Sequence, residues 1–194
     1  MTEAIGRRER KKAQTRKALA DAALELFLDR GYDQVGVREV ADAADVSVTT
    51  LFKYFPSKEA LVFDLDEDIE AALVAAVRER PTGRSLLAAL REHIVTRASA
   101  VSDSARNQAF TRMIEGTPAL REYARRMWLR HETALARTIA EEVGASESDP
   151  SCAAMARFAL EAVDLARRRT DPPGAVGAVF DLLENGWAAT YPDP

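Results

Sequence analysis

The chain has 194 residues, of which 47% are apolar and 30% charged, and its formal net charge is −4 at pH 7. This length allows one sizeable core, or a small domain joined to a larger one. No apolar run approaches the ~18 residues that a membrane span needs, no signal peptide is recognisable, and the single cysteine, Cys152, excludes an internal disulfide. We therefore expect a cytoplasmic protein without membrane association, cofactor or metal site.

Positive charge is concentrated at the N-terminus, although the chain as a whole is acidic. The first 17 residues hold seven lysines and arginines against two acidic residues, whereas residues 61–194 hold 16 basic and 21 acidic residues. Local positive charge is what phosphate binding requires. The basic arm formed by Arg7, Arg8, Arg10, Lys11 and Lys12 is therefore predicted to follow a DNA backbone or to enter the minor groove.

Three helices are predicted in the first 56 residues. The first starts near Arg10 and is stopped by Gly31, and its apolar residues recur at helical spacing: Leu19, Ala22, Ala23, Leu26 and Phe27. A short second helix covers residues 37–44 and is followed by a tight turn at 45–46. Ser47 is a good N-cap for a third helix over residues 48–55, because its side chain can accept an N–H two or three residues further on.

Six longer helices are predicted in the remainder, separated by proline and glycine. They run from about Ser57 to Arg80, Ser85 to Ser102, Ser104 to Glu115, Pro118 to Val143, Cys152 to Arg169 and Ala175 to Thr190. Residues with high helix propensity dominate, and no alternating strand pattern occurs. The expected fold is all-α. A three-helix helix-turn-helix head with its basic arm occupies residues 1–56, and a bundle of about six helices occupies residues 57–194.

Residues 16–61, RKALADAALELFLDRGYDQVGVREVADAADVSVTTLFKYFPSKEAL, strongly resemble the tetracycline-repressor-like (TetR/AcrR) family of bacterial regulators. The resemblance rests on the Ala-Ala-x-x-Leu-Phe first helix, Gly31-Tyr32, VREVADAADVS and TLFKYFPSKEAL, and it spans about a quarter of the chain. It implies a homodimer, a DNA-binding head, and a body that senses a small molecule.

This chain departs from the family pattern at four positions in the head. Gly36 stands where the family usually has a phosphate-binding threonine, so that contact is expected from a backbone N–H. Asp45 replaces the usual turn glycine, and aspartate tolerates the left-handed conformation. Phe52 and Tyr54 replace tyrosine and histidine; phenylalanine cannot donate to a phosphate, whereas tyrosine can.

The DNA-binding residues implied by the resemblance lie on the arm, the second and third helices and the following turn. They are Lys12, Gly36, Val48, Thr49, Thr50, Lys53, Tyr54 and Lys58. On the third helix, Lys53 is expected to reach guanine, and Val48 and Thr49 a thymine methyl. Lys58, at the start of the fourth helix, is expected to hold a phosphate. The alternatives are a solvated helix face for the third helix and an ordinary surface lysine for Lys58.

Two residue sets in the body follow from the resemblance. The dimer interface is expected on the last two helices, at Ala156, Phe158, Leu160, Val176, Val179, Phe180, Leu183 and Trp187. The effector pocket is expected among Phe63, Leu90, His93, Ile94, Phe110, Met113, Ile114, Met127, Trp128 and His131. The alternative for both sets is that they only close the core of one chain. Because aliphatic and aromatic residues outnumber acidic ones in the pocket set, a lipophilic effector is favoured.

The leading hypothesis is a transcriptional repressor that binds a palindromic double-stranded DNA operator as a homodimer and is released by a small molecule. A DNA-binding dimer without a ligand is the alternative within the same class. An enzyme is the third hypothesis. It is disfavoured because neither histidine lies in a recognisable nucleophile motif and there is no glycine-rich phosphate loop.

Overall fold

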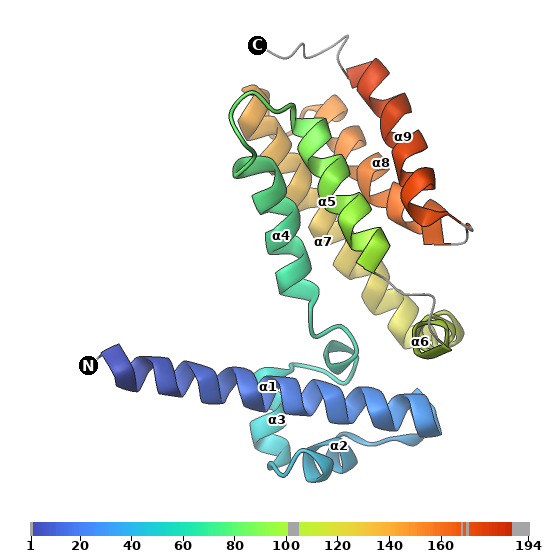
Figure 1. The fold of residues 1–194 in the computed structure, drawn as a ribbon. Coiled ribbons are helices and arrows are strands. Elements are labelled where there is room, and N and C mark those ends of the chain that lie inside the picture. Colours follow the sequence, from blue (N-terminus) through green and yellow to red (C-terminus); the bar gives the residue numbers. More distant parts are fainter. Residues whose placement is uncertain (1, 101–104, 168, 170, 188–194) are drawn as a thin grey trace. The chain divides into compact units, whose positions relative to one another are not determined.

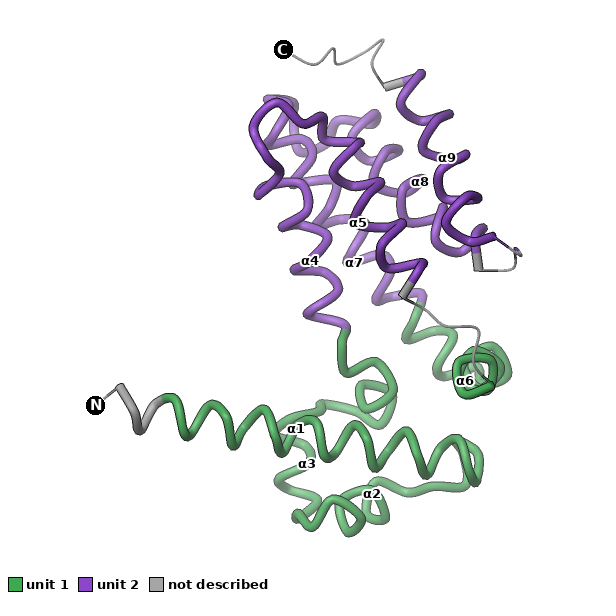
Figure 2. Tube along the Cα trace, in the orientation of Figure 1, with its two compact units in different colours: residues 1–65, 104–124 green, residues 66–103, 125–194 purple. Residues whose placement is uncertain are grey.

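The computed structural model describes residues 2–100, 105–167, 169 and 171–187 (Figure 1). Within these ranges the chain forms nine α-helices and no strand, which confirms the predicted all-α class. Packing divides the chain into two compact units (Figure 2). The first unit comprises residues 1–65 and 104–124, and the second comprises residues 66–103 and 125–194. No helix among the described residues is long and apolar enough to cross a membrane.

The first unit is built on one long helix against which the short helices pack. Its elements are α1 (Thr2–Arg30), a 3₁₀ turn (Tyr32–Gln34), α2 (Val37–Ala43), α3 (Val48–Tyr54), a second 3₁₀ turn (Glu59–Leu61), α6 (Ala105–Gly116) and the beginning of α7 (Pro118–Val143). Leu19 and Phe27 of α1 are buried against Leu51 and Phe55 from the α3 region. Leu120 of α7 is fully buried in the same core. The apolar stripe predicted for the first helix is therefore the face of α1 on which the other elements of this unit pack.

The second unit is a bundle around a separate apolar core. It contains α4 (Asp66–Arg78), α5 (Leu86–Ala100), the greater part of α7, α8 (Pro150–Arg167) and α9 (Pro172–Trp187). Leu90, Ile94, Leu135, Ile139 and Phe180 are almost completely buried in its core. Helix α9 packs against both α5 and α8, so its apolar face is covered by its own chain.

The two units differ in extent from the predicted division into residues 1–56 and 57–194. The segment 57–65 packs with the head because Leu61 and Val62 are buried in the head core. Residues 104–124 belong to the same unit. The functional assignment of the two predicted regions stays a prediction, but the packing unit of the head is larger than its helix-turn-helix.

Two predicted helix starts in this region are wrong. Helix α1 begins at Thr2 rather than near Arg10, so the basic arm is helical. The fourth helix begins at Asp66 rather than at Ser57. The Ser57 hydroxyl accepts the Ala60 N–H at 3.3 Å, but it caps only a 3₁₀ turn, and the chain then bends to bury Leu61 before α4 starts.

Aspartate caps extend the last two helices toward their N-termini. Helix α8 starts at Pro150 because Asp149 Oδ1 accepts the N–H groups of Ser151 and Cys152, at 2.8 and 3.0 Å. Helix α9 starts at Pro172, with the Gly174 N–H donating to Asp171 at 3.0 Å. The predicted ends at Ser102, Ser104 and Thr190 lie outside the described residues.

The turn between α2 and α3 has the conformation expected for it. Asp45 has φ of +51°, and it is the one residue other than glycine with positive φ in the described part of the chain. The Val46 N–H returns to the Ala41 carbonyl at 2.9 Å, which closes the turn. Aspartate is one of the few residues that adopt this conformation routinely, so Asp45 preserves the turn without the usual glycine.

Candidate nucleic-acid interface

Helix α3 presents a polar outer face because its other face is buried. Leu51 and Phe55 point into the core with at most 1% of their surface exposed. Thr49 and Lys53 are exposed on the opposite side, and no ion pair of Lys53 occurs among the described residues. A short helix that packs on the core through its apolar side, and whose lysine and threonine are exposed to solvent, has the geometry needed to enter a DNA major groove.

The other residues of α3 that were predicted to contact DNA are less exposed than Thr49 and Lys53. The Thr50 hydroxyl lies 2.9 Å from the Ser47 hydroxyl, whose oxygen also accepts the Thr50 N–H at 3.1 Å and so confirms the predicted N-cap. Val48 and Tyr54 are half-buried and pack against the head core. Phe52, in contrast, is 47% exposed, although it was not among the predicted DNA contacts.

The backbone N–H of Gly36 is already occupied. It donates to Glu39 Oε2 at 2.8 Å, and Glu39 Oε1 forms an ion pair with Arg30 at 2.7 Å. These two contacts, first the Gly36 N–H and then Arg30, lower the pKa of Glu39. In this structure Glu39 therefore holds the N–H that was expected to serve a phosphate, and the contact of Gly36 with DNA stays a prediction. Glu39 uses that donor to close the start of α2.

Lys58 is directed back toward the end of α1. Its Nζ donates to the Tyr32 carbonyl at 2.5 Å and lies 4.0 Å from the centre of the Tyr32 ring. Burial lowers the pKa of Lys58. The Tyr32 hydroxyl donates to Glu59 at 3.0 Å, and burial, followed by this contact, raises the pKa of Tyr32. Lys58 and Glu59 thus join the second 3₁₀ turn to the loop after α1, a structural role that the sequence did not reveal.

Arg16 of α1 makes contacts that sequence reasoning missed. Its Nη2 donates to the Asp64 carbonyl at 2.7 Å, and its Nη1 donates to the Tyr54 carbonyl at 3.4 Å. Its guanidinium lies 4.8 Å from the centre of the Phe55 ring. One side chain therefore secures the C-terminal end of α3 and the segment that leads to α4. A signal was present, because Arg16 lies three residues before buried Leu19 and so on the inner face of α1.

The basic arm is an exposed helical surface. Arg7, Arg8, Arg10, Lys11 and Lys12 lie on α1 with exposed side chains. Within the described residues none of them forms an ion pair, whereas Lys17, further along, pairs with Asp21 at 2.6 Å. These cations are available to phosphates. Together with the outer face of α3, they define the class of protein as a helix-turn-helix DNA-binding protein.

Comparison with known proteins gives the family. Residues 19–65 match the model described as "Bacterial regulatory proteins, tetR family". The HTH-type transcriptional regulator TcmR of Streptomyces glaucescens is 36% identical over 152 residues, which cover 74% of this chain and 67% of TcmR. The transcriptional regulator MftR of Mycobacterium tuberculosis is 29% identical over 185 residues, which cover 91% of this chain and 93% of MftR.

A solved structure shares the fold over nearly the whole chain. The transcriptional regulator FadR from Bacillus subtilis, in complex with stearoyl-CoA, superimposes with a TM-score of 0.56 at 18% identity, covering 88% of this chain and 98% of FadR. The chain described here belongs to the tetR family of bacterial regulatory proteins. It is a sequence-specific DNA-binding transcriptional regulator, as the resemblance of residues 16–61 predicted.

The residues predicted to line an effector pocket divide between the two cores. In the second unit, Leu90, Ile94, Met127 and His131 are buried, and Trp128 packs against the same core. In the first unit the predicted residues pack around the head core instead, namely Phe63, Phe110, Met113 and Ile114. The predicted set is therefore divided between two packing clusters, and its role in effector binding stays a prediction.

Two histidine nitrogens in the second unit are buried without a hydrogen-bond partner among the described residues, His93 Nε2 and His131 Nδ1. Burial, and secondarily Arg97, lowers the pKa of His93. His131 is completely buried, and its Nε2 lies 2.7 Å from Asp66 Oδ1. Unpaired buried polar atoms are uncommon in folded proteins, so these two nitrogens are the polar groups of this unit with unused bonding capacity.

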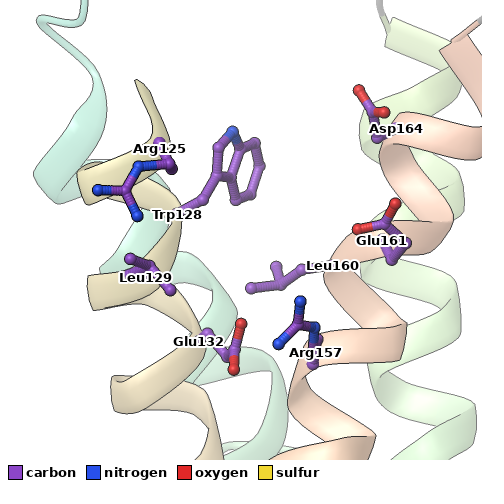
Figure 3. Close-up of a pocket in the computed structure, with 8 residues that line it drawn as sticks. All are labelled: Arg125, Trp128, Leu129, Glu132, Arg157, Leu160, Glu161 and Asp164. Carbon is purple, nitrogen blue, oxygen red and sulfur yellow. The ribbon is translucent and has the colours of Figure 1, made fainter. Parts of the chain in front are cut away.

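A groove of about 270 Å³ lies between α7 and α8 (Figure 3). Trp128, Leu129 and Leu160 supply its apolar surface. Its charged lining consists of Arg125, Glu132, Arg157, Glu161 and Asp164. Of the residues predicted to bind an effector, Trp128 lines this groove, and its ring meets that of His131 edge-on at 5.4 Å.

Most residues predicted at the dimer interface are covered by their own chain. Ala156, Leu160, Val176 and Phe180 are buried in the core of the second unit, and Val179 and Leu183 are half-buried against it. Phe158 remains 51% exposed. The side chain of Trp187 lies outside the described part of the chain. An apolar stripe at helical spacing marked the buried face of α9 rather than a free surface.

We expect Arg16→Ala to lower the free energy of unfolding by about 1–3 kcal/mol, because it leaves two carbonyls without their donor. It should also weaken DNA binding, since the end of α3 loses an anchor. Urea denaturation and fluorescence anisotropy with labelled DNA measure the two effects. The matched control is Lys17→Ala, which removes only an exposed ion pair and should change stability by less than about 0.5 kcal/mol. Equal stability of the two variants would contradict the role of Arg16.

Proposed function

We propose that the protein is a repressor that binds a roughly palindromic operator as a homodimer and is released by a small lipophilic effector. The observation that carries the DNA-binding part is the uncommitted outer face of α3, with Thr49 and Lys53 exposed over a buried Leu51. In a major groove, Lys53 would donate to guanine O6 and N7, and the Thr49 methyl and Val48 would meet a thymine methyl. The protein would act in the cytoplasm, where its DNA lies.

The phosphate contacts are shared between the arm and the loop before α4. Lys12 and its neighbours on α1 would supply exposed positive charge, which raises affinity for any sequence. Lys58 uses one ammonium donor on the Tyr32 carbonyl and retains two for a phosphate. Tyr54 keeps its hydroxyl as a donor, whereas Phe52 offers only an apolar ring to the DNA.

The surface for a second copy lies on α8 and α9. Three apolar side chains are exposed there: Phe158 and Leu165 on α8, at 51% and 50%, and Leu182 on α9, at 74%. Phe158 and Leu165 are seven residues apart and so share one helical face. Two such faces brought together by a two-fold axis would bury apolar surface on both chains and pair two recognition helices with two half-sites about 34 Å apart.

The effector site is proposed in the second unit. Leu90, Ile94 and Met127 supply apolar surface, and the unpaired nitrogens of His93 and His131 supply polar contacts for a ligand. FadR, which shares this fold, has been solved with stearoyl-CoA, a lipophilic ligand of this general kind. A ligand-independent DNA-binding dimer is the competing interpretation.

Operator selection from random double-stranded DNA tests the proposal directly. We expect the selected sequences to contain an inverted repeat. We expect stearoyl-CoA to raise the melting temperature of the protein and to weaken operator binding, because a ligand that binds one of two conformations more tightly shifts the equilibrium toward that conformation. Coenzyme A alone is the control and should have neither effect. Selected sites without an inverted repeat would contradict the dimeric operator. Operator binding that stearoyl-CoA leaves unchanged would favour the ligand-independent dimer.

We expect Lys53→Ala to reduce discrimination at one base pair of each half-site by about 1–3 kcal/mol, because it removes a base contact. Lys12→Ala, the matched control on the arm, should weaken binding to all sequences alike and lower the salt slope by about one for each subunit of the dimer. Both follow from anisotropy titrations against the selected operator, its single-base variants and random DNA. Equal losses on operator and random DNA for Lys53→Ala would remove it from the base-reading residues.

We expect Phe158→Asp to shift the protein from dimer to monomer at micromolar concentration, because an unpaired carboxylate would be buried in the proposed interface. Sedimentation velocity gives the mass directly. Phe52→Asp is the control, because Phe52 is similarly exposed, at 47%, but lies on α3. A dimeric Phe158→Asp variant would place the interface elsewhere.

A further inference from the structure

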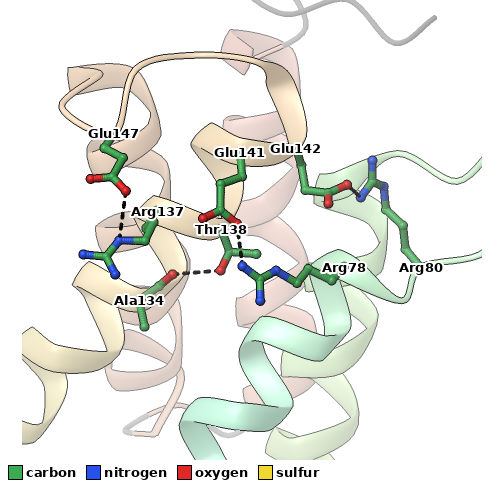
Figure 4. A network of polar contacts seen from close by, with 8 residues as sticks. All are labelled: Arg78, Arg80, Ala134, Arg137, Thr138, Glu141, Glu142 and Glu147. Carbon is green, nitrogen blue, oxygen red and sulfur yellow. Dashed lines mark hydrogen bonds and ion pairs between the residues drawn. The ribbon is translucent and has the colours of Figure 1, made fainter.

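Helix α4 is tied to α7 at both of its ends. At the C-terminal end, Arg78 pairs with Glu141, and Arg80, two residues beyond the helix, pairs with Glu142, each at 2.5 Å (Figure 4). At the N-terminal end the first residue of α4, Asp66, accepts from two consecutive residues of α7. Its Oδ1 lies 2.7 Å from His131 Nε2, and its Oδ2 pairs with Arg130. We call the group Asp66, Arg130 and His131 the α4 latch.

Within the α4 latch, the His131–Asp66 contact is less exposed than the ion pairs at the other end. The side chains of His131 and Asp66 are 0% and 13% exposed, and Arg130, on the outer side of the latch, is 51% exposed. The corresponding values are 50% and 45% for Arg78 and Glu141, and 24% and 29% for Arg80 and Glu142. Because a carboxylate only accepts, the His131 Nε2–H donates to it, and the edge of Trp128 holds the imidazole in place. Charge-assisted bonds in a desolvated position restrain geometry more strongly than exposed ion pairs do.

The α4 latch also occupies a particular place along the chain. Asp66 is the first residue of the second unit, and the preceding residue, Leu65, ends the N-terminal segment of the first unit. Within the first unit, the Asp64 carbonyl is held by Arg16 at 2.7 Å. Leu65, 56% exposed, is therefore the single residue between an anchor in the DNA-binding unit and an anchor in the second unit.

We propose that Asp66, held by Arg130 and His131, is a positioning residue for operator binding. By restraining the first turn of α4, the α4 latch sets the span between the two DNA-binding units of a dimer, and hence the half-site spacing that the dimer accepts. This inference rests on the proposed homodimer. The α4 latch lies outside the DNA-binding unit. It would contribute to operator selection through the spacing of the two linked heads rather than through contacts with bases.

The test compares Asp66→Asn with wild type on a series of operators. Asparagine keeps the shape of aspartate but turns a donor toward Arg130 or His131, which breaks one of the two contacts. The series carries the two selected half-sites at their natural spacing and at spacings altered by a few base pairs, together with a single half-site. We expect Asp66→Asn to bind the natural operator at least about tenfold more weakly, to lose the preference for natural spacing, and to bind the single half-site within about twofold of wild type.

Arg78→Gln is the matched control, because it also removes an α4–α7 ion pair but at the far end of α4. It should keep the wild-type spacing profile. Arg130→Gln is a second latch variant that spares the His131 contact, in case Asp66→Asn unfolds; it should flatten the profile in the same direction. A wild-type profile in both latch variants would overturn the inference, and so would equal losses on full operator and single half-site. A wild-type protein without any spacing preference would instead refute the dimeric operator itself.

Discussion

The recognition helix α3 is seven residues long, too short to persist by its own hydrogen bonds. Its existence and its direction therefore depend on the burial of Leu51 and Phe55 against α1, with Ser47 capping one end and Arg16 holding the other. The polar outer face of α3 follows from this arrangement, because the residues that remain after the apolar ones are buried are those that can meet DNA. The packing of one short helix on one long helix thus determines what the protein can read.

Several charged residues near this surface make contacts that stabilise the fold. Glu39 takes the Gly36 N–H and pairs with Arg30, and Lys58 is drawn to the Tyr32 carbonyl and ring. These contacts hold the loop after α1 and the start of α2 in place. If the helix-turn-helix makes fewer phosphate contacts, the affinity for DNA depends more on the basic arm of α1 and on contacts with the bases.

Local signals predicted the elements of the head well. The Ser47 cap, the left-handed Asp45 and the spacing of Leu19, Ala23 and Phe27 each depend on neighbouring residues only, and each was confirmed. The contacts of Arg16 and Lys58 were not predictable, because they join residues 26 to 48 positions apart. Apolar spacing identified the buried faces of α8 and α9 but not what covers them. Phe158 was among the residues predicted at the interface, whereas the exposed Leu165 and Leu182 became apparent only once the core had been assigned.

The burial of Leu120 with Leu61 in the head core has a consequence for the modularity of the protein. A fragment that ended after the helix-turn-helix would lack the part of α7 that covers this core, as well as the residues of α6 that pack beside it. Its apolar surface would face water, at a loss of roughly 1.5–3 kcal/mol for each large side chain uncovered. We therefore expect the DNA-binding head to need residues 105–124 in order to fold. A chimera that joined it to another body would fold only if the body supplied an equivalent of residues 105–124.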